Sequence, residues 1–357
     1  MQLNDLRLRL QALGALPVHE ARVLRRWAQA QPQEGGRKRL ASFLPKPLLQ
    51  ALPGIEAELS GLARVASAHP AADGSSRLLV ALADGQTVET VLLPPDRAQA
   101  VCVSTQVGCA VGCVFCMTGQ GGLLRQLGSA EIVAQVVLAR QQLGPSRPLR
   151  KVVFMGMGEP AHNLDAVMDS IQLLGTGGGI GHKQLVLSTV GDPRLFERLA
   201  AFGPLDVKPA LALSLHSIKP ALRDQLLPRA PRITPQELVD CGERYARASG
   251  YPIQFQWTLI EGVNDGDDEI DGIAHLLAGK YALMNLIPYN AVPHFPWRRP
   301  SAERAAQMAR ALHRRGVLTK LRHSAGQDVD AGCGQLRARA VSTPLQPVVW
   351  QASRVNG

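Results

Sequence analysis

From about residue 100 onward, short apolar runs alternate with segments in which apolar residues recur at helical spacing. Continuous apolar runs indicate strands that are covered on both faces, as in a parallel sheet. Strands that alternate with helices predict an α/β fold whose parallel sheet curls into a full or partial βα barrel. The seven strand candidates are AVCVSTQV (100–107), KVVFMGMG (151–158), KQLVLST (183–189), PALALSL (209–215), PIQFQWTLI (252–260), YALMNLIPY (281–289) and VLTKLRH (317–323).

Several of the intervening helices begin at a residue suited to the N-cap position. We expect Ser129, Asn163 and Ser301 to cap three of them, because their side chains can accept hydrogen bonds from the first free amides. In barrels of this kind the active site forms at the carboxyl ends of the strands. The residues that follow each strand are therefore the candidates for chemistry.

The first hundred residues have a different pattern. Asn4 is positioned to cap a short helix, and residues 18–30 carry apolar residues at helical intervals. Prolines at 45, 47 and 53 are expected to break that pattern.

Three strand-like runs follow this helical region, at 62–68, 77–83 and 88–93. Asp84-Gly85 lies between the last two and is a strong signal for a hairpin turn. The sequence therefore predicts a β-hairpin linker between the N-terminal helices and the barrel.

Composition narrows the class of protein. Hydrophobic residues make up 46% of the 357 residues and charged residues 19%, as in an ordinary globular protein. No apolar run reaches the roughly 18 residues of a membrane helix, and the first twenty residues lack the apolar stretch of a secretory signal. We expect a cytoplasmic protein with no membrane partner, in which the six cysteines stay reduced.

The net charge of +10 is concentrated at the two ends of the chain. Residues 1–50 hold nine Lys/Arg against three Asp/Glu, and residues 298–357 hold eleven against three. Basic ends around a near-neutral centre favour a polyanionic partner such as nucleic acid. The alternative is genome bias in composition, since only eight of the 39 basic residues are lysine.

Three closely spaced cysteines follow the first barrel strand. Cys109, Cys113 and Cys116 form C-x3-C-x2-C, and thiolates so arranged favour zinc or an iron–sulfur cluster. A cubane cluster has four irons, so three cysteines leave one iron open for a ligand. The alternative is a structural zinc site with Cys102 or a histidine as its fourth ligand.

The C-x3-C-x2-C loop, with an aromatic residue between its last two cysteines, resembles the radical S-adenosylmethionine (SAM) superfamily, and most closely the RlmN/Cfr group of RNA (adenine) methyltransferases. The resemblance runs from Glu89 to Leu336. Its segments are VETVLLP, DRAQAVCVSTQVGCAVGCVFC, GMGEP (156–160), LSTVG (187–191), LALSLHS (211–217), EGVNDG (261–266), NLIPYN (285–290) and DVDAGCGQL (328–336).

The resemblance implies a domain organisation for the chain. Residues 99–340 are expected to form the radical SAM core, a partial (βα)6-type TIM barrel. A basic helical accessory domain at 1–55, a candidate for RNA binding, and a β-hairpin linker at 56–98 precede it, and a tail at 341–357 follows.

The resemblance also implies the catalytic residues. Cys333 matches the cysteine that takes a methyl group from one SAM by direct displacement, a normal reaction for a soft thiolate. A radical made from a second SAM on the [4Fe-4S] cluster would activate that methyl group, and the product carbon radical would add to adenine. Cys102 matches the residue that resolves the adduct through a transient disulfide with Cys333, and Glu89 matches the proton acceptor.

SAM binding is implied at strand ends. Gly158 would allow close approach of the backbone, and the carboxylate of Glu159 can accept the SAM ammonium group. By contrast, Cys241 lies within a helical stretch and is interpreted as a core residue. The remaining matched contacts are Ser188, Ser214, Leu215, His216 and Asn290.

These residues predict a methyltransferase that acts on carbon-2 of an adenosine in 23S ribosomal RNA, with transfer RNA as a second candidate substrate. A Cfr-like carbon-8 enzyme is the nearest alternative, and a non-catalytic RNA-binding metalloprotein is the alternative from another class. The expected partners are RNA and a one-electron reductant such as flavodoxin, and the expected oligomeric state is a monomer.

Overall fold

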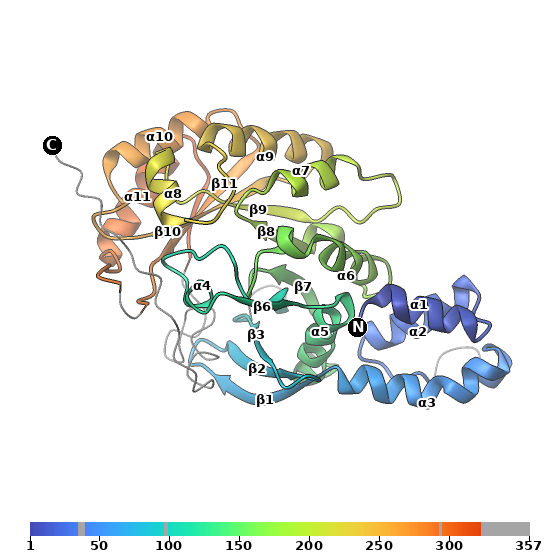
Figure 1. The fold of residues 1–357 in the computed structure, drawn as a ribbon. Helices are drawn as coiled ribbons and strands as arrows, with labels where there is room; N and C mark the ends of the chain where they lie inside the picture. The colour runs from blue at the N-terminus through green and yellow to red at the C-terminus, as the bar shows by residue number, and fades with distance from the viewer. Residues whose placement is uncertain (35–39, 96–98, 293–294, 323–357) are drawn as a thin grey trace.

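A computed structural model describes residues 1–34, 40–95, 99–292 and 295–322, and its main element is a ten-stranded sheet of order β1-β2-β3-β4-β7-β8-β9-β10-β11-β12 (Figure 1). From β4 onward every neighbouring pair is parallel. The first and last of these parallel strands are not paired, so the barrel is partial, as predicted. The seven parallel strands are β4 (Gln99–Cys102), β7 (Leu149–Phe154), β8 (Leu185–Thr189), β9 (Ala210–Ser214), β10 (Ile253–Leu259), β11 (Ala282–Pro288) and β12 (Thr319–Leu321).

Helices connect these strands, and each predicted strand overlaps an observed one. Ser301 caps its helix as predicted, because its side chain accepts a hydrogen bond from the Arg304 amide. The helices of the barrel are α4 (Met117–Gln120), α5 (Ser129–Leu143), α6 (Leu164–Thr176), α7 (Pro193–Ala200), α8 (Pro220–Leu226), α9 (Pro235–Ser249), α10 (Asp267–Leu277) and α11 (Ala302–Arg314), with short 3-10 turns at Pro160–Asn163 and His182–Gln184.

The other predicted caps are wrong in detail. Gln2, rather than Asn4, is the N-cap of the first helix, and Gly128, rather than Ser129, precedes α5. The Ser129 hydroxyl instead accepts a hydrogen bond from the Leu3 amide and donates one to Asp169. Asn163 stands at the N-cap of α6, but its side chain donates to the carbonyls of Thr105 and Leu127. These polar side chains join distant elements, which local patterns do not encode.

The N-terminal helices α1 (Leu3–Ala12), α2 (Pro17–Ala28) and α3 (Lys46–Gly61), with a 3-10 turn at Leu40–Ser42, lie at the end of the molecule opposite α10 and α11 (Figure 1). Pro47 and Pro53 do not end α3, contrary to expectation. Pro47 lies in the first turn, where its missing amide would have no partner. Beyond it, the buried residues Leu48, Leu52, Ile55 and Leu59 recur at helical spacing and hold the helix against the core.

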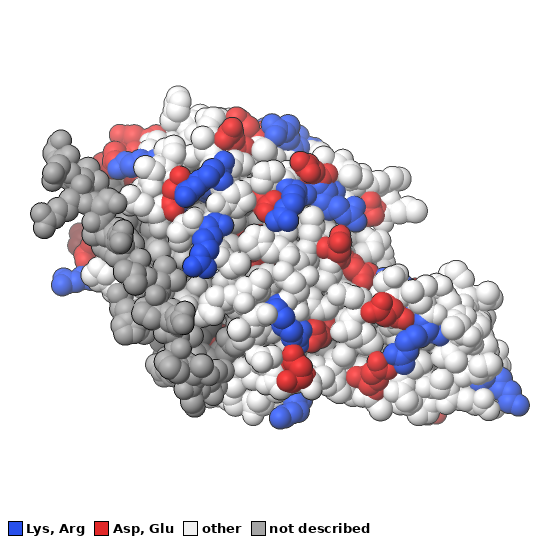
Figure 2. All heavy atoms as spheres, viewed as in Figure 1, with Lys and Arg blue, Asp and Glu red and all other residues white. Residues whose placement is uncertain are grey.

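Charges of the two signs are mixed over the surface. On the face shown in Figure 2, Lys and Arg lie beside Asp and Glu, and no large area carries one sign alone. Arg7 contacts both Glu20 and Asp169, and Arg9 contacts Glu58. Part of the positive charge of the N-terminal helices is therefore neutralised locally.

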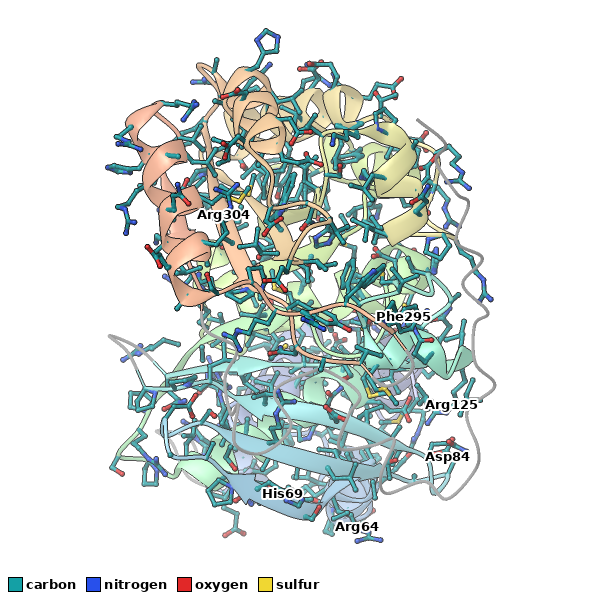
Figure 3. All side chains as sticks on the ribbon, turned by 90° about the vertical axis from the view of Figure 1, so that its left-hand side faces the viewer. Arg64, His69, Asp84, Arg125, Phe295 and Arg304 are labelled. Carbon is teal, nitrogen blue, oxygen red and sulfur yellow. The ribbon has the colours of Figure 1, made fainter. Side chains whose placement is uncertain are left out.

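The predicted hairpin is present and belongs to the main sheet. The strands β1 (Ala63–Pro70), β2 (Ser76–Leu82) and β3 (Thr87–Leu92) are antiparallel, and β3 pairs with β4. At its turn, the Asp84 side chain accepts a hydrogen bond from the Gln86 amide and lies 2.6 Å from Arg125 Nε (Figure 3). Arg125 belongs to β6 (Leu123–Gln126), which pairs with β5 (Gln106–Gly108) in a separate two-stranded sheet.

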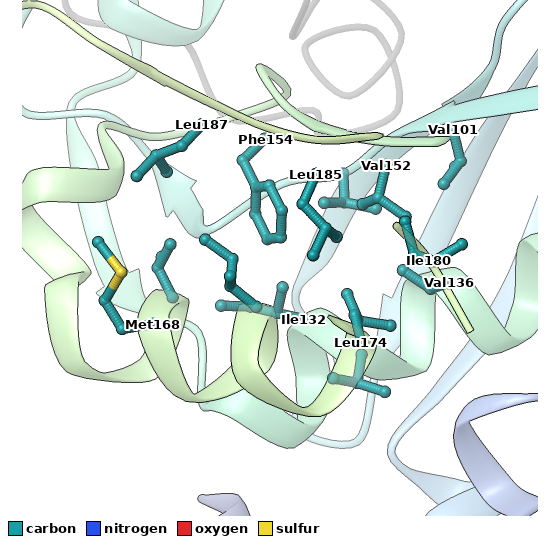
Figure 4. Packing of buried hydrophobic residues seen from close by; sticks show 14 of the residues in the cluster. Val101, Ile132, Val136, Val152, Phe154, Met168, Leu174, Ile180, Leu185 and Leu187 are labelled. Atoms are coloured by element: carbon teal, nitrogen blue, oxygen red, sulfur yellow. The ribbon is translucent and has the colours of Figure 1, made fainter. Parts of the chain in front are cut away.

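The core lies between the parallel sheet and the helices. Val152, Phe154 and Leu185 pack against Ile132 of α5 and Leu174 of α6 in one continuous cluster (Figure 4). Burying these side chains is the main stabilising contribution to the fold. Because successive strand residues point to opposite faces, their neighbours Val153 and Val186 belong to a second cluster on the concave face.

Toward the later strands, the concave face becomes polar. In β10, Gln254, Gln256 and Thr258 alternate with the buried residues Phe255 and Trp257. The prediction of apolar strand faces throughout is therefore wrong here. A concave face that carries polar side chains among apolar ones is a surface on which a polar ligand can be held.

Candidate active site

The three motif cysteines lie in one loop that joins β5 to α4. The Cys109 amide donates to the Gly122 carbonyl, and Gly108 has a left-handed φ of +85°, where a side chain would collide with the backbone of Gly122. Farther along, the Val114 amide donates to the Leu226 carbonyl. The β5–β6 pair and α8 thus hold the loop at the carboxyl end of the barrel.

A cavity of about 320 Å³ opens against this loop. Its volume is in the range of small-molecule sites. The three cysteines line one part of it, and residues from five strand ends line the rest. Among the predicted SAM contacts, those that line it are Gly158, Glu159, Ser188, Ser214, His216 and Asn290.

The cysteine thiols lie in surroundings that disfavour free thiolates. Burial raises the pKa of Cys109 to about 12 and raises the pKa of Cys113 and Cys116 above the ordinary value. Charges on the neighbouring thiols raise the pKa of Cys113 further. A bound cation reverses this balance, because it stabilises the deprotonated sulfur.

The donor set of this loop fits an iron–sulfur cluster. Three sulfur ligands share one cavity, and thiolate is the ligand that such clusters prefer. Within the described residues, no three His, Cys, Asp or Glu side chains are gathered tightly enough to hold a single metal ion. The cysteines of a cubane each bind a different iron, so they are spaced more widely than the ligands of one ion.

The GMGEP segment after β7 brings the backbone close to β5. Gly158 has φ +107°, and a methyl group there would lie 2.7 Å from Thr105 Oγ1 and Gln106 Cβ. The Glu159 amide donates to Gln106 Oε1 at 2.7 Å. Glycine at 158 is therefore required both by the conformation and by the close approach.

Gly158→Ala is expected to destabilise the protein by about 1–3 kcal/mol, because it combines backbone strain with overlap against β5. It should also weaken SAM binding, since Gly158 lines the cavity. Urea unfolding and calorimetric titration of the reconstituted protein with SAM measure the two effects. Gly181→Ala is the control, because Gly181 has φ −62° and the nearest atom to an added methyl is 3.9 Å away. Equal effects of the two substitutions would contradict this interpretation.

Glu159 is buried at the edge of the cavity. Its carboxylate accepts hydrogen bonds from the Ala161 and Val190 amides at 3.1 and 3.0 Å. Burial raises the pKa of Glu159 to about 7, although these hydrogen bonds act in the opposite direction. A cationic group in the cavity would favour the charged carboxylate, as the proposed contact with the SAM ammonium group requires.

His216 offers the cavity a neutral hydrogen-bond donor. Burial lowers the pKa of His216 to about 3, with Arg223 adding to the effect. Its Nδ1 accepts a hydrogen bond from the Thr258 amide at 2.9 Å, so the proton of the neutral ring is on Nε2. The ring lies 4.6 Å from that of Phe115 in the cysteine loop, and the backbone adopts a left-handed φ of +62°.

Leu215 differs from the other predicted SAM contacts. Its side chain is fully buried in the main core, and it does not line the cavity. Gln256 and Thr258 do line it and were not predicted. The signal for them was present in IQFQWTL, where polar residues occupy every second position of a strand.

Glu89 and Cys102 lie on neighbouring strands beside this site. Val91 of β3 pairs with Cys102 of β4, so Glu89, two residues earlier, shares their face. Both side chains are buried, and burial raises the pKa of Cys102 to about 11. Cys333 lies outside the described residues, so its placement relative to them stays a prediction.

The fold and the cysteine loop define a radical SAM protein. The sequence model of the Radical SAM superfamily matches residues 103–277, and the chain belongs to this superfamily, which implies a [4Fe-4S] cluster and SAM as cofactors. A radical SAM methyltransferase from Sphaerobacter thermophilus, a solved structure, is 36% identical, superposes with a TM-score of 0.79, and covers 94% of this chain and 97% of its own.

Within the superfamily, the chain belongs to a family of RNA methyltransferases, which confirms the resemblance found in the sequence. A probable RNA methyltransferase of Methylibium petroleiphilum is 70% identical over 96% of this chain and 94% of its own length. Another from Pseudomonas aeruginosa is 61% identical over 95% and 96%. Of the helices in the described residues, none is both long and apolar enough to cross a bilayer.

Proposed function

We propose that this radical SAM methyltransferase methylates carbon-2 of an adenosine in 23S ribosomal RNA, with transfer RNA as a further substrate. The observation that carries the proposal is the position of Glu89 and Cys102 on one face of adjacent strands, where Cys102 forms a hydrogen bond with the backbone of Met155, a residue that lines the cavity of the cysteine loop. A general base and a buried thiol close to the proposed cluster suit the methylation of a carbon that does not react by polar methyl transfer.

The chemistry of the target explains why such groups are needed. Carbon-2 of adenine lies between two ring nitrogens and is electron-poor, so it does not attack the methyl group of SAM. The cluster of Cys109, Cys113 and Cys116, together with SAM, supplies a carbon radical when bound. The residues of the chain then carry the methyl group, take up the ring proton and release the product.

Three side chains divide these tasks. Cys333 would carry the methyl group as a thioether, formed when its thiolate attacks the methyl carbon of one SAM and S-adenosylhomocysteine leaves. Glu89 takes the proton of the target carbon. The Cys102 thiolate attacks the Cys333 sulfur, so that an S–S bond forms while the S–C bond to the base breaks, and the released carbon takes up a proton to become the methyl group. The unpaired electron left by the radical addition would return to the electron donor, and a reductant would reopen the disulfide before the next turnover. Two SAM molecules are used per turnover.

The cavity residues orient SAM and exclude water. Glu159 accepts the ammonium group, and His216 donates from its Nε2–H, with Gly158, Ser188, Ser214 and Asn290 as the remaining contacts. In this proposal, the helical residues 1–55 contact RNA, and the linker 56–98 carries Glu89. A flavodoxin-like protein supplies the electrons. We expect a cytoplasmic monomer.

Isotope labelling of the RNA tests the position of methylation. An rRNA fragment is transcribed with adenosine deuterated at carbon-2 or at carbon-8 and incubated with the reconstituted protein, SAM and reductant. We expect one deuterium to be lost per methyl group only from the carbon-2 label, with 2-methyladenosine in the nucleoside digest by mass spectrometry. Loss from carbon-8 would identify the Cfr-like alternative. Absence of any methyladenosine would favour the non-catalytic alternative.

A further inference from the structure

A buried ion pair lies beside the proposed proton acceptor. Arg77 Nη1 of β2 is 3.4 Å from Glu89 Oε2 of β3, and the two side chains are 3% and 2% exposed. Their strands are antiparallel neighbours, with Arg77 opposite Val91 and Leu79 opposite Glu89. Arg77 and Glu89 are therefore diagonal neighbours on one face of the sheet.

Cys102 lies on the same face of the sheet as Arg77 and Glu89. Arg77, Val91 and Cys102 occupy one row across β2, β3 and β4. The charges of Arg77 and Glu89 both act on the Cys102 thiol, in opposite directions. The ion pair thus belongs to the surroundings of the proposed reaction and not to the outer part of the hairpin.

A second contact fixes Glu89 from the barrel side. The Ser104 hydroxyl donates to the Glu89 carbonyl at 2.6 Å and accepts from the Met157 amide at 2.9 Å. Ser104 therefore links β3 to the GMGEP segment that lines the cavity. The backbone of Glu89 is held in place independently of its side chain.

Stability alone does not account for this ion pair. Every residue of β2 after Ser76 is buried, and apolar side chains fill its remaining buried positions. Taking two charges out of water is costly, and apolar pairs of similar volume are often as stable or more so. A buried arginine in an otherwise apolar strand therefore indicates that its charge has a functional role.

We propose that Arg77 is a positioning residue that holds the Glu89 carboxylate charged and oriented to accept the proton of the target carbon. This inference rests on the proposed function of Glu89. A buried carboxylate without a cationic partner tends to bind a proton, and a protonated acid accepts no further one. In the transfer, the C–H bond breaks, its electron pair stays with the base, and the proton bonds to a Glu89 oxygen.

Arg77 also has a role after the transfer. Once Glu89 is neutral, it no longer balances the positive charge of Arg77 beside it, and the nearby charge favours release of the proton. Lysine keeps the charge at this position, whereas methionine keeps only the apolar volume. The pair Arg77→Lys and Arg77→Met therefore separates the charge from the packing.

The test follows two steps separately in the full-length reconstituted protein. The first step is methylation of Cys333 by SAM in the absence of RNA, which does not need Glu89. In Arg77→Met, the fraction of Cys333 that is methylated, measured by mass spectrometry, should stay within about twofold of wild type. Turnover on RNA should fall at least about a hundredfold, as expected for loss of a general base, and a covalent protein–RNA adduct should accumulate. Arg77→Lys should restore most of the turnover. Arg247→Met, which removes an exposed ion-pair partner of Glu243 on α9, is the control.

Glu89→Gln separates failure of this inference from failure of the proposed function. If Glu89→Gln accumulates adduct while Arg77→Met turns over normally, Arg77 has no such role and the function of Glu89 stands. If Glu89→Gln turns over normally, the proposed proton transfer fails and the inference with it. If Arg77→Met does not fold, Arg77→Gln is used in its place. Equal amounts of adduct in Arg77→Gln, which lacks the charge, and in Arg77→Lys, which keeps it, would overturn the inference.

Discussion

Replacing Cys109, Cys113 or Cys116 with alanine is expected to remove the brown colour of the anaerobically reconstituted protein and to reduce RNA methylation to background. All three residues line the cavity, and in the proposed cluster each would supply one sulfur ligand, so each loss would leave an iron without its protein ligand. Visible absorbance, iron content and methyl transfer to RNA measure the result. The fold should persist, because the loop is also held by backbone hydrogen bonds to Gly122 and Leu226.

Cys241→Ala is the matched control for these substitutions. Cys241 lies on α9 and is not the core residue that the sequence predicted, because it is a half-buried free thiol whose sulfur accepts a hydrogen bond from Arg244 at 3.0 Å. Its removal should leave colour and activity unchanged. Colour retained in all three loop variants would contradict the cluster assignment, and a colourless zinc protein would support the structural zinc site instead.

The strands of the barrel could be predicted because each is a continuous apolar run that ends before a turn or a capped helix. The caps were less predictable. Ser301 caps α11 through a hydrogen bond three residues away, whereas Ser129 bonds Leu3 and Asp169, which only the folded chain brings near. Local chemistry is visible in a sequence, whereas contacts between residues 40 or 126 positions apart, such as these two, are not.

The same distinction applies to the site. Sequence motifs identified the cysteine loop and GMGEP, and both line one cavity. Arg77 could not be identified in this way, since a single arginine in a strand is equally compatible with a solvent-facing position. Only the register of β2, β3 and β4 places it beside Glu89 and in line with Cys102.

Cys102→Ala is expected to stop the proposed reaction after the base has been joined to the protein. Without the thiol on β4, the thioether of Cys333 has no partner with which to form a disulfide, so the methylated base is not released. The expected product is a stoichiometric covalent protein–RNA adduct, with multiple turnover abolished. Denaturing gels with labelled RNA and mass spectrometry of the Cys333 peptide measure it.

The buried environment of Cys102 limits the reactions that its thiol can undergo. The thiol is buried, and its pKa is raised to about 11, so it is protected from solvent reagents until the partner cysteine and RNA are in place. Cys102→Ser should behave like Cys102→Ala, because a hydroxyl of similar size forms no disulfide. Cys241→Ala should turn over normally. Free RNA and repeated turnover in Cys102→Ala would refute resolution by a disulfide, whereas loss of cluster absorbance in that variant would assign Cys102 to the metal instead.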